Sequence, residues 1–401
     1  MADLKTSFLG IESPNPFWLA SAPPTDKAYN VNRAFEAGWG GAVWKTLGEA
    51  GPPIVNVSGP RYGALHSNER RVIGFNNIEL ITDRPLETNL EEIRQVKRDW
   101  PDRALVVSVM LPMNEAAWSK YLPMIEDTGC DGFELNFGCP HGMSERGMGS
   151  AVGQVPEYIQ MATEWAKQAT SLPVIVKLTP NVTNIVPPAK AALDGGADAV
   201  SLINTINSIM RVDYDSLTMY PTTDGMGTHG GYCGEAVKPI ALNMVAEIAR
   251  NTDTASLPIS GIGGVTDWRD AVDFLALGAS NVQVCTAAMV YGFRIIDDLV
   301  DGLGTFLDDK GLTLAQLVGK AVPSVTDWQY LNLNYVEKAV IDQDLCIECG
   351  RCHIVCEDTS HQAITSMVDG KRRFEVIDDE CVGCNPVSYT HLRAHETYIT
   401  I

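Results

Sequence analysis

The chain has 401 residues, of which 45% are hydrophobic and 20% are charged, and its formal net charge is −20. A surface this negative repels phosphate backbones and anionic membranes, which disfavours nucleic-acid and membrane-surface partners. No run approaches the ~20 apolar residues that span a bilayer, and the N-terminus lacks a basic segment followed by an apolar one, so we expect a cytoplasmic protein.

Eight short apolar, β-branched runs recur along the chain. They are "FWLASA", "GAVWKT", "ALVVSVML", "GFELNFGC", "PVIVKLT", "AVSLINT", "PISGIGG" and "NVQVCTA". The stretches between them, such as "MNEAAWSKYLPMIEDTG" and "WRDAVDFLALG", carry apolar residues at helical spacing. Strands that alternate with helices indicate a parallel sheet. Eight repeats predict an α/β fold, the closed (β/α)8 TIM barrel, whose active site lies at the C-terminal ends of the strands.

Two connections between strand and helix are long, at residues 48–90 and 207–236. Long connections in compact domains are more often functional lids and binding loops than filler. The alternation fades from about residue 312, and a cysteine-rich segment follows. We therefore expect a barrel domain at residues 1–311, a linker at 312–337, a small module at 338–385 and a tail at 386–401.

Lysines stand at the ends of two apolar strands, as Lys45 and Lys177. A cation at such a place needs an anion or an electron-rich ring, although an internal carboxylate would also serve, and the residues leave both readings open. Glycines and polar residues close the seventh and eighth strands, among them Gly263, Gly264 and Thr286. Barrels often bind a phosphate there, but glycines in tight turns without a ligand are the alternative.

The loop after the fourth strand, "ELNFGCPHGMSERGMG", is rich in glycine and polar residues, including Asn136, Cys139 and His141. A thiol can donate protons near neutral pH, so Cys139 is a candidate acid. The competing interpretation is a small buried apolar residue, and we assign that one to Cys130, Cys233 and Cys285.

Six cysteines lie within 39 residues near the C-terminus, at Cys346, Cys349, Cys352, Cys356, Cys381 and Cys384. In a reducing cytosol such density indicates metal ligands rather than disulfides. The first four have the spacing C-x2-C-x2-C-x3-C, which is typical of ferredoxins with [4Fe–4S] clusters and fits zinc poorly.

A second run begins at Cys381 and Cys384, but Val387 and His391 stand where its next cysteines belong. Because the fourth cysteine of each run ligates the other cluster, each cluster then has three cysteines and is incomplete as written. The ending "PVSYTHLRAHETYITI" contains "SYTHLRAHET", which looks like translated adapter sequence, so we expect the natural protein to continue differently after about Asn385. A divergent tail that uses His391 or another ligand is the alternative.

The segments "LASAPPT", "WKT", "LNFGCPHG", "VKLTPNVT", "NT" and "GIGG", followed by the ferredoxin run, together resemble the catalytic subunit of bacterial NAD-dependent dihydropyrimidine dehydrogenase. The resemblance covers about residues 1–385. The dihydroorotate dehydrogenases share the FMN barrel, but they typically have Asn in place of His141 and lack the fused clusters.

The resemblance implies two 4Fe–4S clusters in the family and an FMN in the barrel, which the two lysines would stabilise when it is reduced. It implies that residues from several strand ends border the FMN or hold its phosphate: Ala20, Ser21, Lys45, Thr46, Lys177, Gly230, Gly231, Gly263, Gly264, Cys285 and Thr286. It further implies that the pyrimidine ring is held by Asn114, Asn136, Asn204 and Thr205.

The implied reaction reduces the 5,6 double bond of uracil or thymine, with hydride delivered to C6 and Cys139 protonating C5. Electrons from NADH would arrive through a FAD and iron–sulfur partner subunit and the clusters, since no G-x-G-x-x-G fingerprint opens a helix here. We therefore expect a hetero-oligomer. The alternatives are a dihydroorotate dehydrogenase-like flavoenzyme, an electron-transfer protein with a scaffold barrel, and an aldolase or isomerase barrel without FMN.

Overall fold

The computed structural model describes residues 2–51 and 54–384. The chain divides into two compact units, one ending at Val325 and the other beginning at Thr326. The expected linker at residues 312–337 spans this division. The expected tail at 386–401, with Val387 and His391, lies outside the described residues, as does Asn385. The domain boundaries that we expected from the sequence stay predictions.

Eight parallel strands close into a barrel in the first unit, in the order β10, β15, β16, β3, β4, β7, β8, β9. They are β3 (Phe17–Leu19), β4 (Gly41–Leu47), β7 (Ala104–Val109), β8 (Gly132–Asn136), β9 (Val174–Lys177), β10 (Ala199–Leu202), β15 (Ile259–Ile262) and β16 (Ala279–Val284). Each lies within one of the eight apolar runs or overlaps it, so the predicted (β/α)8 barrel is confirmed. All residues of β4, β7 and β8 are buried, because helices cover a parallel barrel outside and side chains fill it inside.

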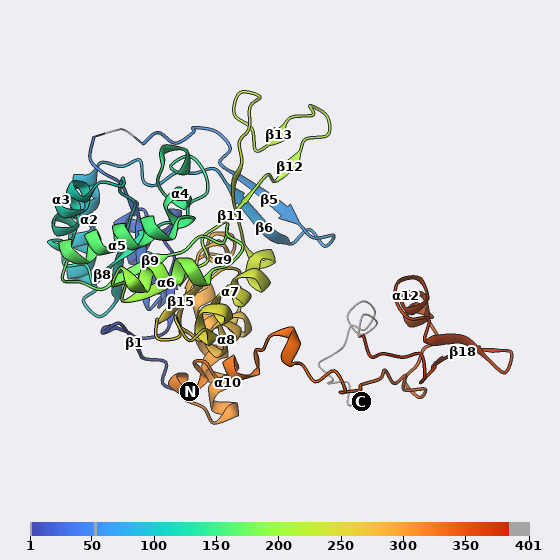
Figure 1. Cartoon of the computed structure of the whole chain (residues 1–401). Helices are drawn as coiled ribbons and strands as arrows, with labels where there is room; N and C mark the ends of the chain where they lie inside the picture. The colour runs from blue at the N-terminus through green and yellow to red at the C-terminus, as the bar shows by residue number, and fades with distance from the viewer. Residues whose placement is uncertain (1, 52–53, 385–401) are drawn as a thin grey trace. The chain divides into compact units, whose positions relative to one another are not determined.

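Helices surround the barrel (Figure 1). They are α1 (Ala28–Ala37), α2 (Leu86–Asp99), α3 (Glu115–Glu126), α4 (Ser150–Gly153), α5 (Pro156–Ala169), α6 (Val186–Asp194), α7 (Lys238–Arg250), α8 (Trp268–Ala276), α9 (Thr286–Tyr291), α10 (Ile295–Lys310) and α11 (Leu314–Leu317). Their apolar faces are buried against the strands, as Trp118, Ile159 and Phe274 illustrate. In the described part of the chain, no helix is long and apolar enough to cross a membrane.

An N-terminal hairpin of β1 (Thr6–Phe8) and β2 (Ile11–Ser13) packs against the interior of the barrel. Phe8 meets Trp18 edge to face at 5.8 Å and shares an apolar cluster with the buried Val43 and Val106. This cluster fills the end of the barrel where the strands begin. The polar side chains that could bind a ligand therefore lie at the other end of the barrel, where the strands finish.

The two long connections pair with each other in a four-stranded antiparallel sheet, which we call the lid sheet. Its strands are β5 (Tyr62–His66) and β6 (Val72–Asn77) from the first connection, and β11 (Ile206–Ser208) and β14 (Gly230–Cys233) from the second. A small hairpin, β12 (Arg211–Val212) and β13 (Met219–Tyr220), extends the second connection. In Figure 1, β5, β6, β11, β12 and β13 gather on one side of the barrel.

The second unit is small. It contains α12 (Arg351–Thr359) and the antiparallel pair β17 (Ile364–Val368) and β18 (Lys371–Val376). Its buried core consists of Cys356, Ala363, Ile364 and Phe374. A core of this size offers little apolar burial, which contributes little to the stability of the unit.

Candidate active site

A large cavity lies at the C-terminal ends of the barrel strands and is bounded by the lid sheet. The space between its walls is about 1380 Å³, open solvent included. Thirteen of the residues predicted at the flavin and substrate site line it: Ala20, Ser21, Lys45, Thr46, Asn136, Cys139, Lys177, Asn204, Thr205, Gly263, Gly264, Cys285 and Thr286. The structure thus brings together side chains that are far apart in the sequence.

Three predicted residues do not line the cavity. Asn114 is exposed and its Oδ1 accepts a hydrogen bond from the Ala116 amide at 3.0 Å, so it caps α3. Gly230 and Gly231 belong to β14, and a Cβ built on Gly231 would lie 2.1 Å from Thr205 Oγ1. The glycine thus allows the lid strand to approach Thr205. The cofactor and substrate roles of these three residues stay predictions.

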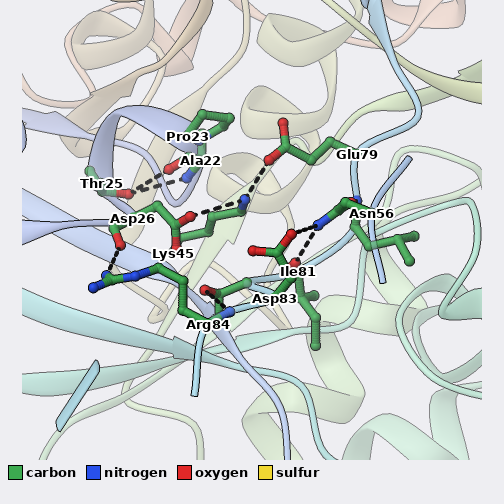
Figure 2. Close-up of polar contacts among 12 residues, drawn as sticks. Ala22, Pro23, Thr25, Asp26, Lys45, Asn56, Glu79, Ile81, Asp83 and Arg84 are labelled. Carbon is green, nitrogen blue, oxygen red and sulfur yellow. Dashed lines mark hydrogen bonds and ion pairs between the residues drawn. The ribbon is translucent and has the colours of Figure 1, made fainter. Parts of the chain in front are cut away.

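Lys45 is paired with two carboxylates. Its Nζ lies 2.6 Å from Glu79 Oε1 and 3.5 Å from Asp26 Oδ2, and Figure 2 shows it between them. The side chains of Lys45 and Glu79 are 6% and 9% exposed, so the pair is largely withdrawn from water. The sequence left open whether Lys45 meets an internal carboxylate or a bound anion or ring, and the structure shows internal carboxylates beside it.

Lys177 is also paired with a carboxylate, that of Glu134 at 3.1 Å. Glu134 is completely buried and also accepts hydrogen bonds from Ser201 and Gln283 at 2.9 and 3.0 Å. Gln283 must direct its Nε2 to Glu134 because a carboxylate only accepts. Its Oε1 is buried and has no partner among the described residues.

The polar side chains above this layer form one hydrogen-bonded chain. Asn204 Nδ2 donates to Asn136 Oδ1 at 3.0 Å, and Asn136 Nδ2 donates to Thr46 Oγ1 at 3.0 Å. Thr46 continues the chain to Ser108 at 2.8 Å and to Ser21 at 3.2 Å. These bonds hold the predicted substrate amides in one orientation before any ligand arrives.

The thiol of Cys139 lies at the cavity wall and contacts the carbonyl oxygen of His141 at 3.7 Å. Desolvation by the surrounding protein raises the pKa of Cys139 to about 11, although the His141 contact and the charge of Lys177 oppose this shift. The thiol is therefore protonated at neutral pH. Such a group is suited to donating a proton rather than to acting as a thiolate nucleophile.

His141 is buried beside Cys139, and its Nε2 lies 2.9 Å from the carbonyl oxygen of Glu79. Because that carbonyl only accepts, Nε2 carries the hydrogen. Burial lowers the pKa of His141, so the ring is neutral. Its Nδ1 is a buried acceptor with no partner in the described part of the chain.

Sequence reasoning missed several cavity residues. Asn77 and Glu79 lie in the first long connection, in "FNNIELI", and Tyr62 lies on the neighbouring strand. The sequence feature that could have indicated them is the run of polar residues inside a connection that we expected to be functional. Gln283, which lines the cavity, and the buried Glu134, which pairs with Lys177, lie on barrel strands. There the available sign was a polar residue within an apolar run.

Four of the six cysteines of the second unit lie in or against its small core: Cys356 belongs to the core cluster, and Cys346, Cys352 and Cys381 pack against it. The pKa of Cys352 is raised first by burial and then by Cys346 and Cys349, which places these three thiols near one another. The amides of Ala363 and Ala339 donate to Cys356 and Cys381 at 3.2 and 3.4 Å, and Ser360 lies 3.0 Å from the sulfur of Cys384. Among the described residues no three metal-ligating side chains converge on one point. The thiols are suitable donors for an iron–sulfur cluster, but the described residues do not complete one.

The sequence profile of the family described as dihydroorotate dehydrogenase matches residues 3–307, and that of a 4Fe–4S dicluster domain matches residues 339–388. The chain belongs to the dihydroorotate dehydrogenase family. This family assignment confirms that the protein is an oxidoreductase. Together with the dicluster domain, it also confirms the predicted cofactors, FMN and 4Fe–4S clusters.

Curated relatives within this family are similar along most of the chain. The NAD-dependent dihydropyrimidine dehydrogenase subunit PreA of Escherichia coli is 39% identical over 363 residues, 90% of this chain and 87% of the relative. The chloroplastic dihydropyrimidine dehydrogenase (NADP(+)) of Arabidopsis thaliana is 41% identical over 76% of this chain and 73% of its own length. The catalytic subunit of dihydroorotate dehydrogenase B from Pyrococcus abyssi is 34% identical over 80% of this chain and 99% of its own. The resemblance inferred from the motifs is confirmed.

Solved structures of the dihydroorotate dehydrogenase family share the fold. The ligand-free enzyme of Eimeria tenella superposes with a TM-score of 0.65 over 80% of this chain and 92% of its own, at 19% sequence identity. At this identity the likeness supports the barrel alone.

The cavity of this family member fits FMN on two observations. The buried Oε1 of Gln283 requires a donor that the described residues do not supply. Gly263 and Gly264 have φ values of +127° and +80°, and a Cβ on Gly264 would lie 2.8 Å from Lys238 and 3.0 Å from the Gly234 carbonyl. Only glycine allows this backbone to turn so tightly in the cavity wall, which Thr286 at the start of α9 also lines. Such a turn is suited to a phosphate.

Proposed function

We propose that the chain is the catalytic subunit of a dihydropyrimidine dehydrogenase that reduces the 5,6 double bond of uracil and thymine. The similarity to the E. coli and A. thaliana proteins supports this substrate class. The alternative is a dihydroorotate dehydrogenase-like enzyme, which the similarity to the P. abyssi relative supports.

The charged residues of the cavity favour the dihydropyrimidine dehydrogenase function over the dihydroorotate dehydrogenase function. Lys45 is paired with Glu79 and Asp26, and Lys177 is paired with Glu134. Within the described residues, the cavity wall has no arginine and no other lysine. A carboxylate such as that of orotate would enter this site without a cation of its own, at a large desolvation cost. A neutral pyrimidine has no such requirement.

The hydrogen-bonding groups of the cavity suit a pyrimidine ring. Uracil alternates N–H donors with carbonyl acceptors, and an amide side chain offers one of each. Asn136 and Asn204 line the cavity in a fixed orientation, and Asn77 adds a third amide. The carboxylate of Glu79 adds a strong acceptor for a ring N–H.

Cys139 is the proton donor in this proposal. The hydrogen on its sulfur passes to C5 of the pyrimidine as C6 receives hydride, so two electrons and two hydrogens saturate the bond. FMN, when bound, supplies the hydride chemistry. Lys45, Lys177 and the turn at Gly263 are the residues that would hold the cofactor.

The electrons come from NADH through a partner subunit that carries FAD and iron–sulfur clusters. Two observations support a partner: the E. coli relative is named as an NAD-dependent subunit, and no G-x-G-x-x-G fingerprint opens a helix in this sequence.

An anaerobic assay with a chemical electron donor tests the proposal without the partner. Reduced methyl viologen is supplied to the FMN-loaded chain together with uracil, thymine or orotate, and the products are separated by chromatography. We expect dihydrouracil and dihydrothymine and no dihydroorotate. Formation of dihydroorotate alone would assign the alternative function.

A further inference from the structure

Two side chains of the first long connection, those of Arg61 and Tyr62, contact the carboxylate of Glu79. The hydroxyl of Tyr62 donates to Glu79 Oε2, and Nη1 of Arg61 lies 3.4 Å from Oε1. Arg61 and Tyr62 lie where the connection enters β5, and Glu79 follows β6 closely. The connection therefore carries both the carboxylate and the groups that hold it.

The hairpin geometry explains why these residues meet. Tyr62 stands opposite Asn77 in the β5–β6 pair, and the amide of Ile78 donates to the carbonyl of Arg61 at 3.0 Å. The ring of Tyr62 packs against Phe75, with centroids 5.4 Å apart. The phenol is thus fixed by an aromatic neighbour at its ring and by Glu79 at its hydroxyl.

The barrel holds Glu79 from the other direction. Lys45 of β4 contacts Oε1 at 2.6 Å and also reaches Asp26, as Figure 2 shows. Glu79 therefore joins the lid sheet to the strand ends of the barrel. It lies in the cavity wall, as do Tyr62 and Lys45.

The hydrogen-bond inventory of Glu79 leaves it able to bind a ligand. A carboxylate has about four acceptor sites. Lys45 and Arg61 approach Oε1, whereas Tyr62 approaches Oε2. Oε2 thus retains one acceptor site among the described residues. Burial and the nearby carboxylate raise the pKa of Tyr62 above its ordinary value, so its hydroxyl keeps its hydrogen and remains a donor.

We propose that Tyr62 is a positioning residue for pyrimidine binding, because its hydroxyl orients Glu79 so that Oε2 accepts a hydrogen bond from a ring N–H of the substrate. The inference rests on the proposed function. It also makes the lid sheet part of the substrate site, since Tyr62 of β5 holds Glu79 in the cavity wall.

The test is Tyr62→Phe in the full FMN-loaded chain. Uracil binding to the oxidised protein is measured by calorimetry, and kinetics with a chemical electron donor give KM and kcat. Hydrogen bonds to charged groups are strong, so we expect the Kd and KM for uracil to rise about ten- to hundredfold. We expect kcat to change much less and FMN to stay bound. Tyr214→Phe is the matched control. It also removes a tyrosine hydroxyl, but Tyr214 lies in the second long connection, after β12, and is 82% exposed.

A double-mutant cycle gives the second test. In a Glu79→Gln background, Tyr62→Phe should weaken uracil binding less than about twofold, because the carboxylate that it orients is gone. An unchanged Kd in Tyr62→Phe would overturn the inference. So would full additivity in the cycle, or loss of FMN together with uracil, which would show a merely structural role. Binding of orotate but not uracil by the unmodified chain would instead refute the proposed function.

Discussion

The barrel and the cysteine-rich unit assemble their functional residues differently. The barrel collects side chains from Ala20 to Thr286 at one end of eight strands, and the main polar groups there are already paired with one another. The second unit takes four of its cysteines from one short run, and its core has few buried residues. The comparison teaches that the fold itself builds the barrel site, whereas the cysteine unit has little apolar core to position its thiols.

We expect the largest effect on the rate of uracil reduction when the proposed proton donor of the barrel is removed. Cys139→Ala should lower uracil reduction about 10²- to 10⁴-fold, which is typical for removal of a general acid, while FMN stays bound. Steady-state assays and the flavin absorbance measure the two properties. Cys130→Ala is the control, because Cys130 is buried outside the cavity. Full activity in Cys139→Ala would rule out the thiol as the acid.

The buried carboxylate below the cavity comes next. Glu134→Leu leaves the charge of Lys177 buried without its partner, so the free energy of unfolding should fall by about 3–5 kcal/mol. Urea unfolding measures this. Asp194→Asn, which breaks the half-exposed pair with Lys190, should change it by less than about 1 kcal/mol. Equal effects of the two substitutions would mean that the barrel interior does not stabilise the site as described.

The pH dependence of the half-reaction follows from the pKa of Cys139. In the proposed reaction the thiol acts in its protonated form, and a pKa raised to about 11 keeps it protonated over a wide range. The rate of uracil reduction should therefore show no decline centred on the ordinary cysteine pKa of about 8.5, and it should fall only where uracil loses its own ring proton or at still higher pH. Single-turnover rates on both sides of the ordinary cysteine pKa provide the measurement. A decline centred near an ordinary cysteine pKa would contradict the raised value.

The smallest effect concerns the division between the two units. A chain that ends at Val325 should keep FMN affinity and uracil reduction within about twofold, because the barrel buries its own core. Fluorescence titration with FMN and the chemically driven assay measure both. Loss of FMN on truncation would show that the cysteine unit contributes to the barrel site.

The fold was predictable because its signal is local. Each barrel strand is buried on both faces and reads as an apolar run, as in β7. The residues at strand ends, such as Lys45 and Lys177, follow directly from that arrangement. The position of Glu79 in the cavity wall was not predictable, because it depends on the pairing of β5 with β6 and on the ion pair with Lys45 of β4, contacts between residues that are separated in the sequence. Asn114 was assigned to the substrate site through resemblance; it caps α3, and its substrate role stays a prediction.

The most direct test of the central claim is the half-reaction of the barrel itself. The bound flavin is photoreduced under anaerobic conditions, uracil or orotate is added, and the return of the oxidised flavin absorbance near ~450 nm is followed. The account predicts prompt reoxidation by uracil and none by orotate. Reoxidation by orotate alone would contradict it.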